Sequence, residues 1–261
     1  MSKIRNTFNT ASSNYNDNAF LQNEIANRLA EKLKVISIKP QTIIDLGSGT
    51  GFLSEKTAKI FPNSILVCVD FAQQSLLENS QNLKVCANAY ELPFASNSVD
   101  FIVSNLMMQW CPDLTTLFNE CFRILKPQGL FLFTTFGPDT LKELKRSWSV
   151  VDSSAHVNNF IDMHDIGDQM LQSGFQSPIM EMENITLTYE KVVDLMHDLK
   201  AIGAQNVANR SKALTGKTKF KKMIEMYENY REDGKLPATY EVIYGHAWKN
   251  EKKLGAISLE N

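Results

Sequence analysis

The sequence predicts an α/β fold in which helices cover both faces of a mostly parallel sheet. Three observations support this prediction. From residue 42 onward, apolar strand-like segments alternate with helical ones, a glycine-rich turn follows the first strand, and segment 130–136 (L-F-L-F-T-T-F) is nearly continuous and apolar. Such alternation produces a parallel sheet with helices on both sides. A continuous apolar strand is expected where both faces of the sheet are covered.

The first half of the chain carries the regular alternation. A helix is predicted over 17–35, because Leu21, Ile25, Leu29 and Leu33 fall on one helical face and polar residues such as Gln22 lie elsewhere. Strands follow at 42–46, 64–69, 84–87, 99–104 and 130–136. Helices between them are predicted at 52–60, 72–79 and 113–124, the last stopped by the sequence K-P-Q-G at 126–129.

The alternation loosens after residue 137. Helices are predicted at 139–150, 162–173, 190–201 and 216–231, and strands at 179–189 and 239–246. Two late strands joined by a helical insertion predict an antiparallel C-terminal edge to the sheet. We interpret residues 1–261 as a single domain, with an N-terminal helical lid (1–36), a ligand-binding core (37–137) and substrate-side additions (138–250).

Composition narrows the class of protein and its compartment. A net charge of −2 and a pI near 6.1 argue against nonspecific nucleic-acid binding. No apolar run approaches the ~20 residues of a membrane span, and the N-terminus lacks the apolar region of a signal peptide. The four cysteines form no C-x-x-C pair, and no histidine has a metal-ligand spacing. We therefore expect a cytoplasmic protein with reduced thiols and no metal site.

The most informative motif is I-I-D-L-G-S-G-T-G-F at 43–52. Its glycines, Gly47, Gly49 and Gly51, permit positive φ and close approach of a ligand to the backbone. A dinucleotide fingerprint would need glycine at position 52, which is Phe52, and a phosphate-binding P-loop would need G-K-[ST]. The next strand ends in Asp70, and an acid there can accept both hydroxyls of a ribose. The motif predicts a nucleoside site without a phosphate cradle.

The D-x-G-x-G-x-G form resembles motif I of the class I S-adenosylmethionine-dependent methyltransferases, whose cofactor has no phosphate. The resemblance implies their Rossmann-like fold and S-adenosyl-L-methionine as the cofactor. Segment 87–94 (A-N-A-Y-E-L-P-F) is similar to the family string A-D-A-x-x-L-P-F, in which the acid accepts the adenine amino group. Here an amide replaces that acid, and its oxygen can accept the same bond. The implied cofactor-binding residues are Asp45, Gly47, Gly49, Gly51, Asp70, Asn88, Ser104 and Asn105.

Five strings outside the motif resemble the malonyl-acyl carrier protein O-methyltransferases. They are S-N-L-M-M-Q-W-C (104–111), F-G-P-D-T-L-K-E-L (136–144), H-V-N-N-F-I-D-M-H-D (156–165), D-L-K-A-I-G-A-Q-N (198–206) and L-P-A-T-Y-E-V-I-Y-G-H-A-W (236–248). The resemblance covers nearly the whole chain. It implies methylation of the free carboxylate of malonyl carried on acyl carrier protein, which is the implied partner, and the ester then primes pimeloyl synthesis for biotin.

This chemistry fits a chain without an evident catalytic dyad. A carboxylic acid titrates near ~4, so the malonyl carboxylate is already ionised at neutral pH and needs no general base. A cation should orient it, and arginine suits that geometry. Of the two arginines near the family strings, Arg146 and Arg210, we expect Arg210 to be the anchor.

Two further residues are candidates for the reaction. Tyr15 lies in the segment A-S-S-N-Y (11–15), and a tyrosine in such a segment closes over cofactor and acceptor in related methyltransferases, although a lone aromatic can equally pack on the core. His156 and His164 flank a polar loop beside the expected acceptor site, and we take His156 as the candidate. A lysine-rich stretch at 212–222 is either a docking surface for an acidic carrier or an ordinary solvated helix face.

Two other readings stay open from the sequence. One is a methyltransferase that acts on another small molecule or on a quinone precursor. The other is a protein-modifying relative similar to mitochondrial complex I assembly factors, which the intact glycine motif does not exclude.

Overall fold

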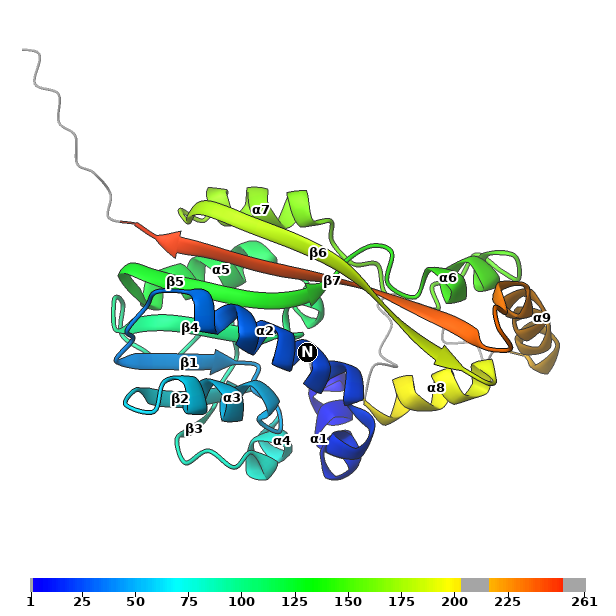
Figure 1. The fold of residues 1–261 in the computed structure, drawn as a ribbon, viewed down its shortest axis with the longest axis horizontal. Coiled ribbons are helices and arrows are strands. Elements are labelled where there is room, and N and C mark those ends of the chain that lie inside the picture. Colours follow the sequence, from blue (N-terminus) through cyan, green and yellow to red (C-terminus); the bar gives the residue numbers. More distant parts are fainter. Residues whose placement is uncertain (1, 203–215, 251–261) are drawn as a thin grey trace, which may run out of the picture.

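The computed structural model describes residues 2–202 and 216–250. Within them, a seven-stranded sheet has the order β3-β2-β1-β4-β5-β7-β6 (Figure 1). The strands are β1 (Thr42–Leu46), β2 (Ile65–Asp70), β3 (Lys84–Cys86), β4 (Val99–Asn105), β5 (Leu125–Phe136), β6 (Gln176–Tyr189) and β7 (Leu236–Lys249). Neighbouring strands from β3 to β5 pair in parallel, and β7 is antiparallel to both β5 and β6. The predicted α/β class and the antiparallel last strand are confirmed.

The α-helices of the described residues fall largely where the periodicity predicts them. They are α1 (Ser2–Asn18), α2 (Phe20–Val35), α3 (Phe52–Ile60), α4 (Gln73–Glu78), α5 (Leu114–Ile124), α6 (Lys142–Ser149), α7 (Met163–Gln172), α8 (Val192–Ala201) and α9 (Lys217–Tyr227). Two short 3₁₀ helices are also present, Met108–Trp110 between β4 and α5 and Glu228–Tyr230 between α9 and β7. No helix among the described residues is long and apolar enough to cross a bilayer.

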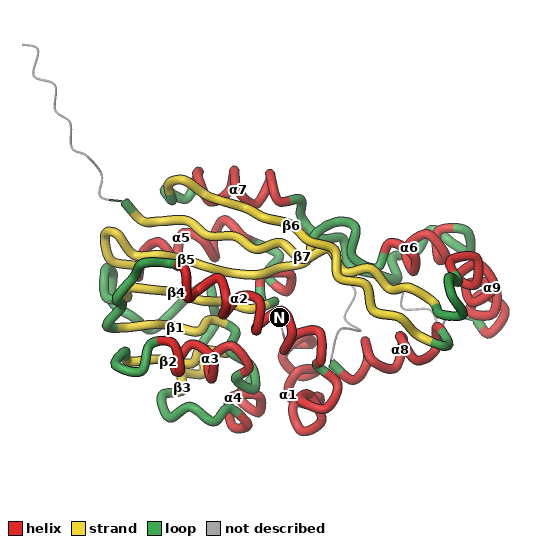
Figure 2. Tube along the Cα trace, in the orientation of Figure 1, coloured by secondary structure: helices red, strands yellow, loops and turns green. Residues whose placement is uncertain are grey.

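The sheet is covered on both faces, as its apolar strands require. On one face, buried side chains of α2 and α3 such as Ile25 and Leu53 form a cluster with strand residues including Phe101. On the other face, Phe118 of α5 and Met170 of α7 pack with a second set of strand residues. Figure 2 shows these two helix layers with the strands between them. This arrangement leaves the carboxyl ends of β1, β2 and β4 accessible from one end of the sheet.

Helix α1 was not expected from the sequence, which predicted a single helix from residue 17. The helix ends at Asn18, and α2 begins after Ala19, whose φ of −90° and ψ of 43° are not helical. The sequence of α1 is polar and lacks a regular apolar stripe, so periodicity does not reveal it. Tertiary contacts with α4 and α8 hold it across the end of the sheet (Figure 1).

The last two strands extend further than predicted. Strands β6 and β7 pair from Gln176 with Trp248 to Tyr189 with Leu236, and this ribbon continues past the end of β5 (Figure 1). Helices α6, α8 and α9 gather at its far end. The ribbon therefore carries a helical cluster that stands beside the carboxyl ends of the parallel strands.

Candidate active site

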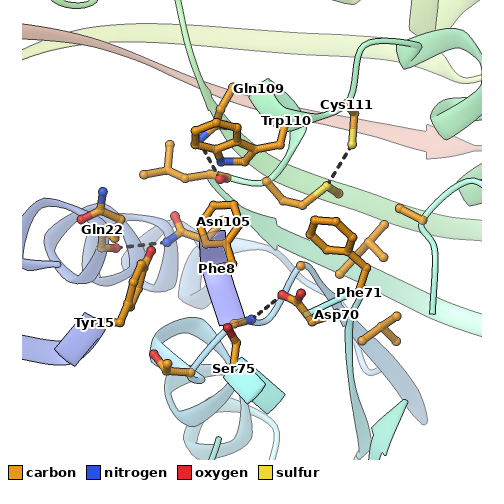
Figure 3. Close-up of a pocket in the computed structure, with 18 of the residues that line it drawn as sticks. Phe8, Tyr15, Gln22, Asp70, Phe71, Ser75, Asn105, Gln109, Trp110 and Cys111 are labelled. Carbon is orange, nitrogen blue, oxygen red and sulfur yellow. Dashed lines mark hydrogen bonds between the residues drawn. The ribbon is translucent and has the colours of Figure 1, made fainter. Parts of the chain in front are cut away.

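A pocket, here called the first pocket, opens at the carboxyl ends of β1, β2 and β4 (Figure 3). Its floor is the glycine loop, and its walls come from α1, α2 and the turn after β4. Its described lining includes Phe8, Tyr15, Gln22, Gly47, Gly49, Asp70, Asn88, Asn105, Gln109 and Trp110. A smaller hollow, the third pocket, adjoins it and is lined by Tyr15, Gln22, Asp45, Gly47, Ser48, Gly49, Thr50 and Asn105, among others.

The glycine loop presents bare backbone to the first pocket. Gly47 and Gly49 have φ of 75° and 51°, in the left-handed region that favours glycine. A Cβ on Gly47 would lie 2.2 Å from Cγ of Met107, so no side chain fits there. A Cβ on Gly49 would meet no atom of the described residues within 4 Å, because it would point into open space. The loop leaves room that a ligand can use.

Asp70 closes one side of the loop. Its two carboxylate oxygens accept hydrogen bonds from the backbone N–H groups of Gly49 (2.9 Å) and Ala72 (2.8 Å). Burial raises the pKa of this carboxyl above its ordinary value, although both hydrogen bonds oppose the shift. Among the described residues that line the first pocket, Asp70 is the single charged side chain. The pocket is therefore suited to a ligand with positive charge and unsuited to phosphate.

Asp45 lies beneath the loop and lines the third pocket. It is 1% exposed, Ser54 donates a hydrogen bond to its Oδ2, and Oδ1 has no partner among the described residues. Burial, reinforced by the charge of Asp70 and opposed by the Ser54 bond, raises the pKa of Asp45 to about 7. A buried carboxylate oxygen without a partner is costly, so a cationic donor in the third pocket would stabilise it. This is where an ammonium group could be held.

Tyr15 and Asn105 lie near each other at the end of the first pocket where Gln22 also lies (Figure 3). Burial, with the charge of Asp70 adding to it, raises the pKa of Tyr15 far above its ordinary value, so the phenol keeps its proton at neutral pH. Asn105 donates to the backbone oxygen of Gln22 (3.0 Å) and accepts from Thr134 (2.7 Å). Tyr15 can therefore act as a hydrogen-bond donor but not as a general base.

Asn88 lines the first pocket from the loop after β3. Its Oδ1 accepts a hydrogen bond from the backbone N–H of Tyr90 (3.2 Å), which gives the loop its turn. An amide oxygen has two lone pairs, so one remains for a ligand.

Among the described residues, two of the predicted site residues, Gly51 and Ser104, do not line these pockets. Gly51 has a φ of 103° just before α3, and a Cβ there would lie 2.8 Å from the Asn79 side chain, so its requirement for glycine is conformational. Ser104 is fully buried and donates to the backbone oxygen of Leu46 (2.7 Å), which joins β4 to β1. Arg210 lies outside the described residues. Gly51 and Ser104 were predicted to bind the cofactor; the contacts they make in the structure support the loop and the strands.

A second pocket lies against the first, under the helical cluster of the β6–β7 ribbon. Its described lining includes Trp148, His156, Phe160, Lys200, Phe220 and Tyr240. Both pockets share Gln22, Gln109, Trp110, Phe136 and Ile202. Its walls are mostly apolar, its described lining contains no acid, and its basic side chains are His156 and Lys200. The two pockets thus carry opposite charge and meet at a common wall.

His156 is held rigidly in the second pocket. Its ring stacks on Trp148 with centroids 3.6 Å apart and planes at 6°, and its Nε2 lies 2.9 Å from Oδ1 of Asp152. Asp152 also accepts from Lys219 (2.9 Å), and these contacts hold the pKa of Asp152 well below its usual range. The ionised partner favours a proton on Nε2. By contrast, His164 is exposed, bonds to the helix cap Asp162, and lines neither pocket.

The sequence did not point to Gln22, Phe8 and Trp110. Gln22 was placed on the polar face of its helix, yet it is 8% exposed, because that part of α2 faces the pockets. Phe8 packs edge-on against Trp110 with ring centroids 5.3 Å apart. Phe8 lies in the helix that periodicity does not reveal, so no signal marked it. Trp110 falls in the string S-N-L-M-M-Q-W-C, which could have drawn attention to it.

Comparisons with known proteins agree with this geometry. Residues 44–133 match the family described as "Methyltransferase domain". The chain is 45% identical to a malonyl-[acyl-carrier protein] O-methyltransferase of Gallionella capsiferriformans, over 94% of this chain and 90% of that protein. It is 43% identical to malonyl-[acyl-carrier protein] O-methyltransferase 1 of Coxiella burnetii, over 95% of this chain and 88% of that protein.

Solved structures share the fold at low sequence identity. A putative methyltransferase of Bacillus halodurans has a TM-score of 0.61 at 14% identity, covering 87% of this chain and 99% of that one. Phosphoethanolamine N-methyltransferase 2 of Haemonchus contortus, in complex with S-adenosyl-L-methionine, has a TM-score of 0.53 at 18% identity, covering 86% of this chain and 53% of that one. The class I methyltransferase fold expected from the glycine motif is confirmed.

Proposed function

The chain belongs to the malonyl-[acyl-carrier protein] O-methyltransferase family, and on this basis we propose that it methylates the free carboxylate of malonyl on acyl carrier protein. The methyl donor is S-adenosyl-L-methionine. The product is the malonyl methyl ester, whose masked charge allows chain extension toward the pimeloyl group of biotin.

One observation carries this proposal beyond family membership: two pockets of opposite charge share a wall. The described lining of the first pocket has an acid and no cation, which suits a cofactor that bears a sulfonium and an ammonium. The described lining of the second has basic side chains and no acid, which suits an acceptor carboxylate. Transfer between two bound groups requires them to meet in line, and the shared wall is where they would do so.

The residues of the first and third pockets fit the cofactor. When bound, S-adenosyl-L-methionine supplies a methyl group activated by its sulfonium. Asp70 keeps lone pairs on both oxygens for the ribose hydroxyls. The remaining lone pair of the Asn88 amide oxygen suits the adenine amino group, and the unpaired Oδ1 of Asp45 suits the ammonium.

The acceptor side needs orientation and not a base, since the carboxylate is ionised at neutral pH. Tyr15, which lines the first pocket and keeps its proton because its pKa is raised, would donate a hydrogen bond to an acceptor carboxylate that reaches into the first pocket. His156, fixed by Trp148 and by the bond between its Nε2 and Asp152, would pack beside the acceptor, and Lys200 adds positive charge. Arg210 stays the predicted anchor from the sequence. Phe8 and Trp110 would exclude water from the transfer.

The carrier would dock beside the second pocket. Helix α9 carries Phe220 in the pocket wall and exposes Lys217, Lys221 and Lys222 around it. Lys219 of the same helix is engaged with Asp152. Carrier proteins are acidic, so a lysine-rich helix at the pocket would attract them despite the net charge of −2.

Complementation tests the proposal in a cell. A biotin-requiring strain that lacks its own malonyl-carrier methyltransferase should grow without biotin when it expresses this chain. Expression of a Gly49→Val variant, which places a side chain in the first pocket, should not restore growth. If the wild-type chain binds S-adenosyl-L-methionine but never restores growth, a different acceptor becomes the better account.

A further inference from the structure

Among the described residues, Gln22 alone lines the first, second and third pockets. It lies in the first turn of α2 and is 8% exposed. Its Oε1 is buried and has no hydrogen-bond partner among the described residues. A buried amide oxygen without a partner costs on the order of 1–3 kcal/mol, so a ligand that supplies a donor would remove this penalty.

The backbone around this side chain is fixed by the sheet. The carbonyl oxygen of Gln22 accepts a hydrogen bond from Asn105 (3.0 Å), at the carboxyl end of β4 (Figure 3). Asn105 is itself held by Thr134 (2.7 Å) on β5. The start of α2 is thereby attached to the same strand ends that form the first pocket, so the backbone that carries the Gln22 side chain has a defined location at the pocket wall.

The neighbouring amide is not available in the same way. Gln109 also lines the first and second pockets, but its Nε2 donates to the backbone oxygen of Leu106 (2.6 Å) and its Oε1 accepts from Thr135 (3.3 Å). Gln109 is therefore committed to the protein. Gln22 is the amide at the shared wall whose oxygen is left for ligands.

We propose that Gln22 bridges the two substrates, accepting an ammonium hydrogen of the cofactor through Oε1 and donating from Nε2 to the malonyl carboxylate. The inference rests on the proposed function. A neutral amide suits this place because it offers an acceptor toward the cationic side and donors toward the anionic side. A carboxylate there would repel the acceptor, and an ammonium would repel the cofactor. Gln22 thus sets the relative position of methyl group and carboxylate oxygen.

Two variants separate the two halves of this role. Gln22→Met has a similar shape and removes both hydrogen bonds, so kcat/KM for malonyl-acyl carrier protein should fall about tenfold to hundredfold. Gln22→Glu keeps the acceptor and removes the donors, so the KM for the malonyl thioester should rise at least about tenfold. Its Kd for S-adenosyl-L-methionine, measured by calorimetry, should stay within about threefold of the wild-type value. Gln172→Glu, on the exposed end of α7, is the charge-matched control and should behave as wild type.

The outcomes distinguish this inference from the proposed function. If the wild-type enzyme makes the ester and Gln22→Met has unchanged kcat/KM, the bridge is refuted and the function stands. A Gln22→Glu variant with a normal KM for malonyl thioester would also refute it, because the amide would then not contact the acceptor. Thermal unfolding of each variant identifies a misfolded protein, and the near-isosteric Met variant keeps the test available if the buried carboxylate prevents folding. If the wild-type enzyme makes no ester, the proposed function itself fails.

Discussion

The backbone N–H of Gly49 donates a 2.9 Å hydrogen bond to the carboxylate of Asp70, and this bond joins the first and second strands of the sheet at their carboxyl ends. The two residues are 21 positions apart in the chain. The bond holds the glycine loop against the end of β2. Each Asp70 oxygen accepts one backbone hydrogen bond, from Gly49 or from Ala72, and keeps a further lone pair for a ligand. The contact therefore favours both the loop shape and, together with the Ala72 bond, the ionised Asp70, the two features that suit a phosphate-free cationic nucleoside.

The loop can be tested with a pair of glycine variants that share the same strain. Gly49 and Gly234 both have positive φ (51° and 77°), and a Cβ on either would meet no described atom within 4 Å. Valine at either position should destabilise the fold by about 1–2 kcal/mol. Calorimetry with S-adenosyl-L-methionine should show at least about tenfold weaker binding for Gly49→Val. Gly234→Val, in a distant turn, should bind normally, and equal binding by both variants would remove the loop from the site.

Asp45 makes stability depend on pH in a defined direction. Its pKa is about 7 in the folded protein against 3.8 ordinarily, so between these values the folded state binds more protons than the unfolded state. The free energy of unfolding should therefore fall as pH rises from ~4 to ~7, by at most about 4 kcal/mol from this group. Asp45→Asn should flatten this part of the profile. Denaturant melts at several pH values measure it, and an unchanged slope in Asp45→Asn would contradict the assignment.

The same group predicts how cofactor affinity responds to pH. An ammonium held by Asp45 needs the ionised carboxylate, so binding should strengthen as pH rises from 5 to 7, by up to about tenfold per unit. Asp45→Asn should bind more weakly, with a shallower pH dependence.

The lysines of α9 are expected to recruit the carrier and not the malonyl group. Reversal of Lys217, Lys221 and Lys222 to glutamate should raise the KM for malonyl-acyl carrier protein. It should also make this KM less sensitive to salt concentration, because the attractive charges that salt screens are gone. The KM for malonyl-coenzyme A and the affinity for the cofactor should not change. A triple reversal of Lys34, Lys39 and Lys84, near the amino ends of the strands, is the matched control. Equal effects of the two triple variants would show that net charge, not docking on α9, is responsible.

Arg210 and Arg146 provide a matched arginine pair for the acceptor anchor. Arg210→Ala should lower turnover even with a small malonyl thioester, because an anchor acts on the carboxylate and not on the carrier. Arg146 is exposed on α6 and lines neither pocket, so Arg146→Ala should retain activity. Full activity of Arg210→Ala would leave Tyr15, His156 and Lys200 as the groups that orient the acceptor.

The sequence predicted the parts of the fold that local patterns specify. The apolar strands and the glycine turn mark β1, α3 and β2 almost to the residue, because periodicity and backbone requirements act locally. Helix α1 was missed because its polar sequence is helical through contacts with α4 and α8, which no local window contains.

The site was predictable to the same extent. Asp70 and Gly49 follow from the motif, but Gln22 looks like an ordinary polar-face residue until the folded chain places three pockets around it. The stacking of His156 on Trp148 likewise depends on tertiary structure. Gly51 and Ser104 show the converse, since residues of a recognisable motif can serve the backbone instead of lining the pocket.

Direct observation of the methyl ester tests the central claim. Purified protein, S-adenosyl-L-methionine and malonyl-acyl carrier protein should yield a carrier whose mass rises by that of one methylene unit, with the label on the malonyl group when the methyl of the cofactor is labelled. Acetyl-acyl carrier protein, which lacks the free carboxylate, should remain unmodified. A protein that binds the cofactor yet leaves malonyl-acyl carrier protein unmethylated would contradict the account.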